Sequence, residues 1–173
     1  KILIYKFLLF ILNINVFSQN YLFKHFGSED GLNDKFINSI TQCHQGFLWF
    51  STSNGLLRFD GQQFEKIETG LKNDDFINAS AIDNAGNLYF GTFSGKIIKY
   101  IKATEKFNIV IEQIGGSVNK IIQSTSSKSF YVISKGNGVY TLKDNTISLL
   151  IKTSEFLVND LHELNHDYLL LST

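Results

Sequence analysis

The amino-acid sequence predicts an all-β protein, a β-propeller of four-stranded antiparallel blades. Three observations favour this fold class. A pair formed by Ile or Val and Asn recurs at spacings of 40, 41 and 40 residues, and turn residues divide each repeat into four short apolar segments. No segment after residue 20 shows a sustained helical period of apolar residues. We therefore expect about three and a half blades, which form an incomplete ring.

Three sequence features repeat in register. The Ile/Val–Asn pairs are Ile37-Asn38, Ile77-Asn78, Val118-Asn119 and Val158-Asn159. Behind the first two pairs, the segment 46–52 matches the segment 86–92, again 40 residues later. A glycine that opens a short apolar run follows in the first three units, at Gly55, Gly95 and Gly138. The predicted blades cover approximately residues 36–69, 76–112, 117–152 and 157–173.

The first unit shows the expected strands most clearly, at residues 36–42, 47–51, 55–59 and 62–67. We predict a two-residue type I′ hairpin at Asp60-Gly61, since both central residues of that turn need positive φ. Inner strands of a propeller are covered on both faces by neighbouring sheets, so Trp49 is expected in the core. The single Cys43 cannot form an internal disulfide and is expected to be a small core residue.

Composition excludes several functions. The chain has 16 basic and 16 acidic side chains, so its formal net charge of zero gives no reason to expect a nucleic-acid partner. Hydrophobic residues make up 43% of the chain, which is enough for a folded core. No phosphate loop, nucleophile elbow or dinucleotide fingerprint is present, and we expect no catalytic residue and no cofactor.

Residues 1–18 are typical of a signal peptide. Lys1 and Lys6 provide the positive end, and residues 7–12 form the apolar stretch. Asn13 and Asn15 interrupt that stretch, which makes it too short to span a membrane. The alternative interpretation is a buried first strand. If the signal peptide is removed, the folded part, residues 19–173, works outside the cytoplasm, in the periplasm or the extracellular space, and does not insert into the membrane.

The first unit resembles the two-component regulator propeller repeat. The segments that carry the resemblance are residues 29–33, 37–40, 46–52 and 55–61, with Phe64, and the second unit is similar over residues 77–100. The match extends over residues 21–110 and weakens in the third and fourth units. It departs from the family at Cys43-His44, where an Asp-containing turn like that at Asp83 is usual.

This resemblance implies a periplasmic sensor region of a bacterial hybrid two-component system. Many members sense oligosaccharides released from complex glycans, and their parent chains carry further blades, a membrane span and a histidine kinase. A homodimer of such a parent is an open expectation. In the family, an N-terminal strand closes the ring by joining the last blade, and residues 21–26 would be that strand. Because the chain stops within the second strand of the fourth unit, we expect it to be a fragment.

Two motifs could carry chemistry but have simpler interpretations. Residues 162–166 fit the H-E-x-x-H pattern of zinc proteases, which requires a helix. The repeat places them in a strand and a turn, where positions four apart are roughly 13 Å apart, so we expect no metal. The adjacent acids Asp74 and Asp75 are expected in a solvated turn.

Propeller geometry predicts where a ligand binds. The connections between blades and the loops between second and third strands lie on one face, and they gather amides, carboxylates and an aromatic side chain. These are the groups that bind sugars or another small ligand. The predicted ligand-binding residues are Asn33, Asp34, Lys35, Asn54, Asn73, Asp74, Asp75, Phe93, Lys135 and Asn137.

Two other functions remain open. A propeller enzyme of the streptogramin-lyase type places His and Glu on one face, whereas the four histidines here fall in strands or on the opposite face. A secreted scaffold or interaction propeller without a kinase is the second alternative. A membrane span and a kinase motif downstream of Thr173 would favour the sensor over the scaffold.

Overall fold

The computed structural model describes residues 23–173 except 35, 73–74, 154–156 and 166–167. The predicted signal peptide therefore lies outside the described residues. Within them, strands form three four-stranded sheets and one two-stranded sheet, all antiparallel, and each sheet pairs its strands in chain order. The only helical element of the described residues is the short 3-10 turn η1 (Ser28–Asp30). The predicted all-β propeller architecture is confirmed.

The strands follow one plan in each blade. The first blade contains β1 (Ile37–Gln42), β2 (Leu48–Thr52), β3 (Gly55–Phe59) and β4 (Phe64–Ile67). The second contains β5 (Ile77–Ile82), β6 (Leu88–Thr92), β7 (Ile97–Ile101) and β8 (Lys106–Ile111). The third contains β9 (Val118–Gln123), β10 (Phe130–Ser134), β11 (Gly138–Lys143) and β12 (Thr146–Lys152). The last sheet is the hairpin of β13 (Asp160–Asn165) and β14 (Tyr168–Ser172).

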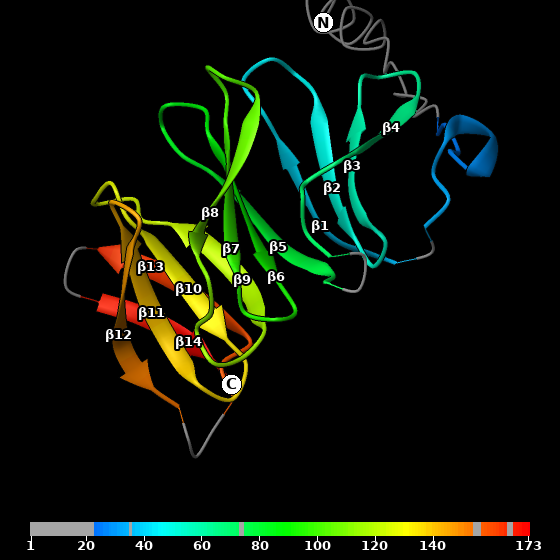
Figure 1. The fold of residues 1–173 in the computed structure, drawn as a ribbon. Coiled ribbons are helices and arrows are strands. Elements are labelled where there is room, and N and C mark those ends of the chain that lie inside the picture. Colours follow the sequence, from blue (N-terminus) through cyan, green and yellow to red (C-terminus); the bar gives the residue numbers. More distant parts are fainter. Residues whose placement is uncertain (1–22, 35, 73–74, 154–156, 166–167) are drawn as a thin grey trace, which may run out of the picture.

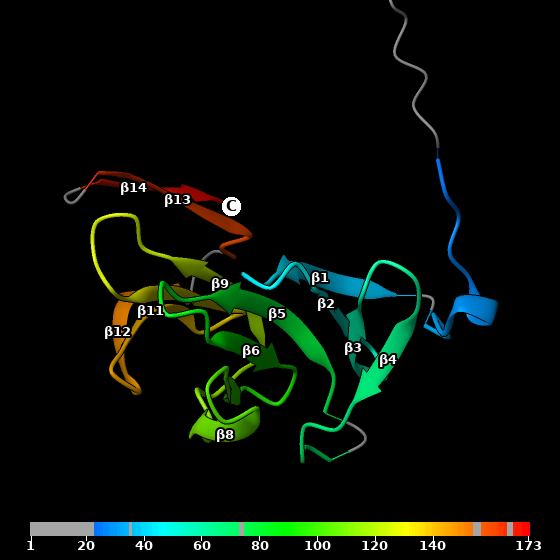
Figure 2. The same cartoon turned by 90° about the horizontal axis from the view of Figure 1, so that it is seen from above.

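The sheets fan out from their first strands (Figures 1 and 2). In the first three blades, β1 contacts β5 and β5 contacts β9, so the innermost strands are neighbours. Polar contacts between blades join residues about one repeat apart. Asn38 Nδ2 donates to the carbonyl of Ile77 at 2.9 Å, the Ser39 and Ser80 hydroxyls are 2.8 Å apart, and Lys120 pairs with Asp160. Equivalent positions thus meet around a common axis.

Apolar side chains fill the wedges between the blades. Trp49 is 2% exposed and lies between blades one and two, where its ring is 5.0 Å from Tyr100 and 6.0 Å from Phe90. Cys43 is buried in the same cluster. A second cluster, which includes Tyr89 and Phe130, fills the wedge between blades two and three. Trp49 and Cys43 are therefore core residues, as predicted.

The outer face of blade one is covered by the segment before β1. Phe26 packs edge-on against Phe59 with ring centroids 4.8 Å apart, and Leu32 joins the same cluster. Residues 23–26 belong to no strand. Residues 21 and 22 lie outside the described part, so the closing strand at 21–26 stays a prediction.

The Asp60-Gly61 prediction is wrong in its turn type. Gly61 has φ of 103°, but Asp60 is not among the described residues with positive φ, and the loop between β3 and β4 has four residues. The Asp60 carboxylate accepts hydrogen bonds from the backbone N–H groups of Gln62 and Gln63, at 2.8 and 2.9 Å. This local pairing stabilises a wider Asx-type turn and also lowers the pKa of Asp60. A two-residue turn with positive φ at both positions instead joins β11 to β12, at Asp144 and Asn145.

Candidate functional site

The loops between second and third strands meet the connections between blades on one face of the arc, which we call the connection face. In blade one, Asp34 joins the two loop types. Its carboxylate accepts a hydrogen bond from Thr52 Oγ1 at 2.7 Å and another from Asn54 Nδ2. The structure brings the predicted residues Asp34 and Asn54 together, and their side chains form a hydrogen bond with each other.

Asp75 occupies the equivalent place in blade two. Its carboxylate accepts hydrogen bonds from Ser94 N at 3.0 Å and Ser94 Oγ at 2.6 Å, and it pairs with Lys96 Nζ at 3.1 Å. Asp75 is 8% exposed, so the expectation of a solvated turn is wrong for this residue. Burial pushes the pKa of Asp75 up, but the hydrogen bonds from Ser94 and the contact with Lys96 outweigh it and leave the pKa below its usual value.

Replacing Asp75 with alanine is expected to lower the free energy of unfolding by about 1–3 kcal/mol, because the Ser94 and Lys96 donors lose their acceptor inside the loop. Chemical denaturation of the intact chain measures the change. Asp60→Ala serves as the matched control, since Asp60 has an exposed side chain that binds only its own turn. Equal losses in the two variants would contradict the role assigned to Asp75.

An open cavity of about 350 Å³ lies on the connection face near the inner strands. The second residue of each inner strand, β1, β5 and β9, is an asparagine that contributes an amide, and the loops contribute one aromatic and one basic side chain. The lining residues are Asn38, Asn78, Phe93, Ser117, Asn119 and Lys135. Sequence reasoning selected Phe93 and Lys135 and missed the asparagines. The Ile/Val–Asn repeat was the available signal, because equivalent inner-strand positions surround the axis of a propeller.

The polar groups of this cavity are held by neighbouring blades or loops. Asn38 Nδ2 contacts Asn78 Oδ1 at 3.5 Å, and Asn119 Oδ1 accepts hydrogen bonds from Ser117 Oγ at 2.8 Å and from Lys135 N at 3.2 Å. The Phe93 side chain is 60% exposed. Its ring lies 6.2 Å from that of Phe76, which is 41% exposed. The site thus combines fixed amides with an exposed aromatic surface.

The remaining predicted residues do not line this cavity. Asn33 is exposed in the segment before β1, and Asn137 lies beside Gly116 in the loop between β10 and β11. Lys35, Asn73 and Asp74 lie outside the described residues. The candidate site on the connection face therefore rests on the asparagines, Phe93 and Lys135.

The described part of the H-E-x-x-H segment, residues 162–165, lies on a strand, as expected. His162 and Glu163 belong to β13, while His166 is outside the described residues. Glu163 is buried and accepts hydrogen bonds from Ser124 Oγ at 3.1 Å, from Thr125 Oγ1 at 2.9 Å and from other donors of the same loop. Across the described residues, no group of three or more His, Cys, Asp or Glu side chains could hold a metal ion. Glu163 acts here as a link between blades three and four.

The geometry of Glu163 determines its acidity. Hydrogen bonds from Ser126 and from the Thr125 N–H and hydroxyl lower the pKa of Glu163 to about 2, against the opposing effect of burial. Burial raises the pKa of Tyr131, and the Glu163 carboxylate adds to that increase. Glu163 therefore remains ionised at neutral pH and cannot serve as a proton donor.

The radial arrangement of the blades defines the chain as an arc of a β-propeller. No family model matches it, and no curated protein matches it. Solved structures with the same fold include the extracellular domain of BT3049 from B. thetaiotaomicron, which is assigned to a hybrid two-component system. That structure is 22% identical with a TM-score of 0.75, over 88% of this chain and 24% of that one.

Two structures of the extracellular domain of BT4673 from the same organism are also similar. One, assigned to a one-component system, is 20% identical with a TM-score of 0.68, over 83% of this chain and 21% of that one. The other, assigned to a hybrid two-component system, is 18% identical with a TM-score of 0.69, over 82% of this chain and 21% of that one. The chain thus spans less than a quarter of the length of these neighbours, and the likeness establishes the fold. Among the described residues, no helix is long and apolar enough to cross a membrane.

Proposed function

We propose that the chain is the extracytoplasmic ligand-sensing part of a two-component signalling protein and recognises oligosaccharides derived from glycans. Its fold is that of extracellular domains assigned to such systems in B. thetaiotaomicron. The export expected from residues 1–18 places the folded part in the periplasm or outside the cell. In this proposal the chain itself is not an enzyme, and the further blades of a parent chain are its partners.

The observation that carries the proposal is the cavity on the connection face. Amides of Asn38, Asn78 and Asn119 can donate and accept hydrogen bonds, as sugar hydroxyls do. The exposed ring of Phe93 offers an apolar surface beside them. Binding sites for small ligands commonly combine such an apolar surface with a few fixed polar groups.

Replacing Phe93 with alanine is expected to weaken oligosaccharide binding by about tenfold, because the exposed ring is the largest apolar surface at the cavity. The intact chain is first screened on an array of glycan-derived oligosaccharides, and affinities for the selected sugar are then measured by calorimetry. Ser53→Ala is the matched control. Ser53 holds the equivalent loop position in blade one and does not line the cavity. If no oligosaccharide binds, the carbohydrate part of the proposal is wrong.

A further inference from the structure

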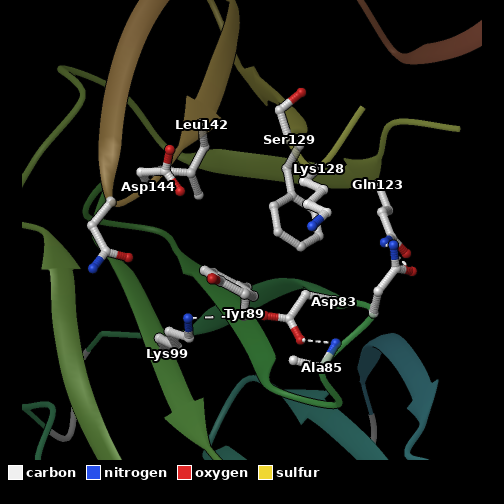
Figure 3. A pocket seen from close by; sticks show the side chains of 12 residues that line it. Asp83, Ala85, Tyr89, Lys99, Gln123, Lys128, Ser129, Leu142 and Asp144 are labelled. Atoms are coloured by element: carbon white, nitrogen blue, oxygen red, sulfur yellow. Dashed lines mark hydrogen bonds and ion pairs between the residues drawn. The ribbon is translucent and has the colours of Figure 1, made fainter. Parts of the chain in front are cut away.

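A further hollow lies on the opposite face of the arc, between blades two and three. It has a volume of about 640 Å³, and we call it the interblade groove (Figure 3). Its residues come from the β5–β6, β9–β10 and β11–β12 turns and from the strands beside them. The lining residues are Asp83, Asn84, Ala85, Tyr89, Lys99, Gln123, Lys128, Ser129, Phe130, Leu142, Asp144 and Asn145.

The base of the groove is packed and apolar. Tyr89 and Phe130, from different blades, have ring centroids 4.6 Å apart, and both are buried. Leu142 is buried beside them. Figure 3 shows Tyr89 between Lys99 and Asp83, with Leu142 and Asp144 above it in this view.

Several polar groups of the groove have partners in the protein. Lys99 Nζ lies 3.8 Å from Asp83 Oδ2 and 4.8 Å from the Tyr89 ring centroid. Gln123 Nε2 donates to Asn84 Oδ1 at 2.8 Å and links the two blades. These contacts hold the Asp83, Asn84, Lys99 and Gln123 side chains in the walls of the groove.

Three exposed side chains of blade three are not engaged. Lys128, Asp144 and Asn145 make no side-chain hydrogen bond or ion pair with the rest of the described residues. They offer one cationic donor, one anionic acceptor and one amide that does both. The positive φ of Asp144 and Asn145, 50° and 59°, holds the last two on a tight turn at the rim.

We propose that the interblade groove is a second saccharide site, which binds an uncharged oligosaccharide. The inference rests on the proposed function, to which it adds a separate site. The four charged side chains of the groove, Asp83, Asp144, Lys99 and Lys128, sum to zero, so the groove does not favour a charged ligand. Sugar hydroxyls donate to Asp144 and accept from Lys128, while the apolar base packs against ring carbons.

A peptide fits the groove less well. An extended peptide gains affinity by pairing with the exposed edge of a sheet. The outer strands of these two blades are β8 and β12, and neither contributes a lining residue. The groove therefore offers side chains and turns in place of a strand edge.

The test blocks the groove without disturbing the core. Ala85 is an exposed turn residue at its wall, and Ala85→Tyr places a bulky side chain there. Gln45→Tyr is the matched control, because Gln45 holds the same turn position in blade one and lines no described cavity. Asp144→Asn removes the free acceptor charge and retains a residue type that tolerates positive φ.

Binding of uncharged oligosaccharides to the intact chain is measured by calorimetry, and thermal unfolding verifies that each variant is folded. We expect Ala85→Tyr and Asp144→Asn each to lower the affinity for the oligosaccharide bound in the groove by about tenfold or more. Gln45→Tyr should bind it like the wild type. If Ala85→Tyr and Asp144→Asn bind with the same affinity as the wild type, the groove site is wrong. This holds even if Phe93→Ala weakens binding and so supports the site on the connection face. Conversely, binding lost in Ala85→Tyr and unchanged in Phe93→Ala would retain the groove and overturn the connection-face site. If the wild type binds only peptides or charged sugars, the groove inference is wrong.

Discussion

Replacing Phe90 with alanine is expected to lower the free energy of unfolding by about 3–5 kcal/mol. Phe90 is fully buried on β6, between the first two blades. Its ring lies 6.0 Å from Trp49 of blade one and 6.2 Å from Phe107 of its own blade. Truncation leaves a cavity in the wedge between two sheets, and twisted sheets cannot close around it without losing their strand pairing.

Denaturant unfolding of the intact chain measures this loss. Phe93→Ala is the control, since the same residue type three positions further along the chain is 60% exposed. We expect that change to alter stability by less than about 0.5 kcal/mol. A comparable loss in both variants would mean that Phe90 does not lie between the blades.

Replacing Glu163 with alanine is expected to cost about 2–4 kcal/mol, because several donors of the β9–β10 loop lose a shared acceptor. Ser124, Thr125 and Ser126 all donate to this carboxylate from blade three, while Glu163 itself belongs to β13. The loss should concentrate where the last hairpin meets blade three. Hydrogen exchange of β13 in the intact chain measures it, with the exposed neighbour His162→Ala as the control.

The same residue predicts a pH dependence. The folded-state pKa of Glu163 is lowered to about 2 from an ordinary value of 4.5. A carboxyl group whose pKa is lowered by folding stabilises the folded state when the pH is above the pKa of the unfolded state. This contribution is lost as the pH falls from about 4.5 towards 2. Protection of β13 should therefore decrease over that range in the wild type. In Glu163→Gln the decrease should be smaller, and an identical decrease would contradict the assignment.

The repeat made most of the fold predictable from the sequence. Equivalent positions of successive blades lie a constant distance apart in the sequence. The pairs at Ile37-Asn38 and Ile77-Asn78 therefore identified the beginnings of β1 and β5. Burial of Trp49 followed from the position of its strand between two sheets. The strand predicted over the first part of the H-E-x-x-H segment is confirmed at residues 162–165.

Details that depend on side-chain partners were not predictable in this way. The turn at Asp60 follows its carboxylate, which binds two backbone N–H groups, whereas the Asp-Gly pair alone suggested a tighter hairpin. The burial of Asp75 depends on Ser94 and Lys96, which lie about 20 residues further along the chain. The interblade groove combines turns from two blades, and no single motif identifies it.

The central claim is that the blades are arranged radially, so that their loops meet on one face. Spin labels at Ser53, Phe93 and Lys135, which occupy equivalent loop positions in three successive blades, test it directly. Three variants are made, each with two of these residues replaced by cysteine for labelling and with the buried Cys43 changed to alanine. Pulsed electron paramagnetic resonance then measures the distance between the two labels in each variant. A radial arrangement predicts that the distance between positions 53 and 135 is clearly shorter than the sum of the two steps through position 93. A distance equal to that sum would show units stacked in a line and would contradict the propeller.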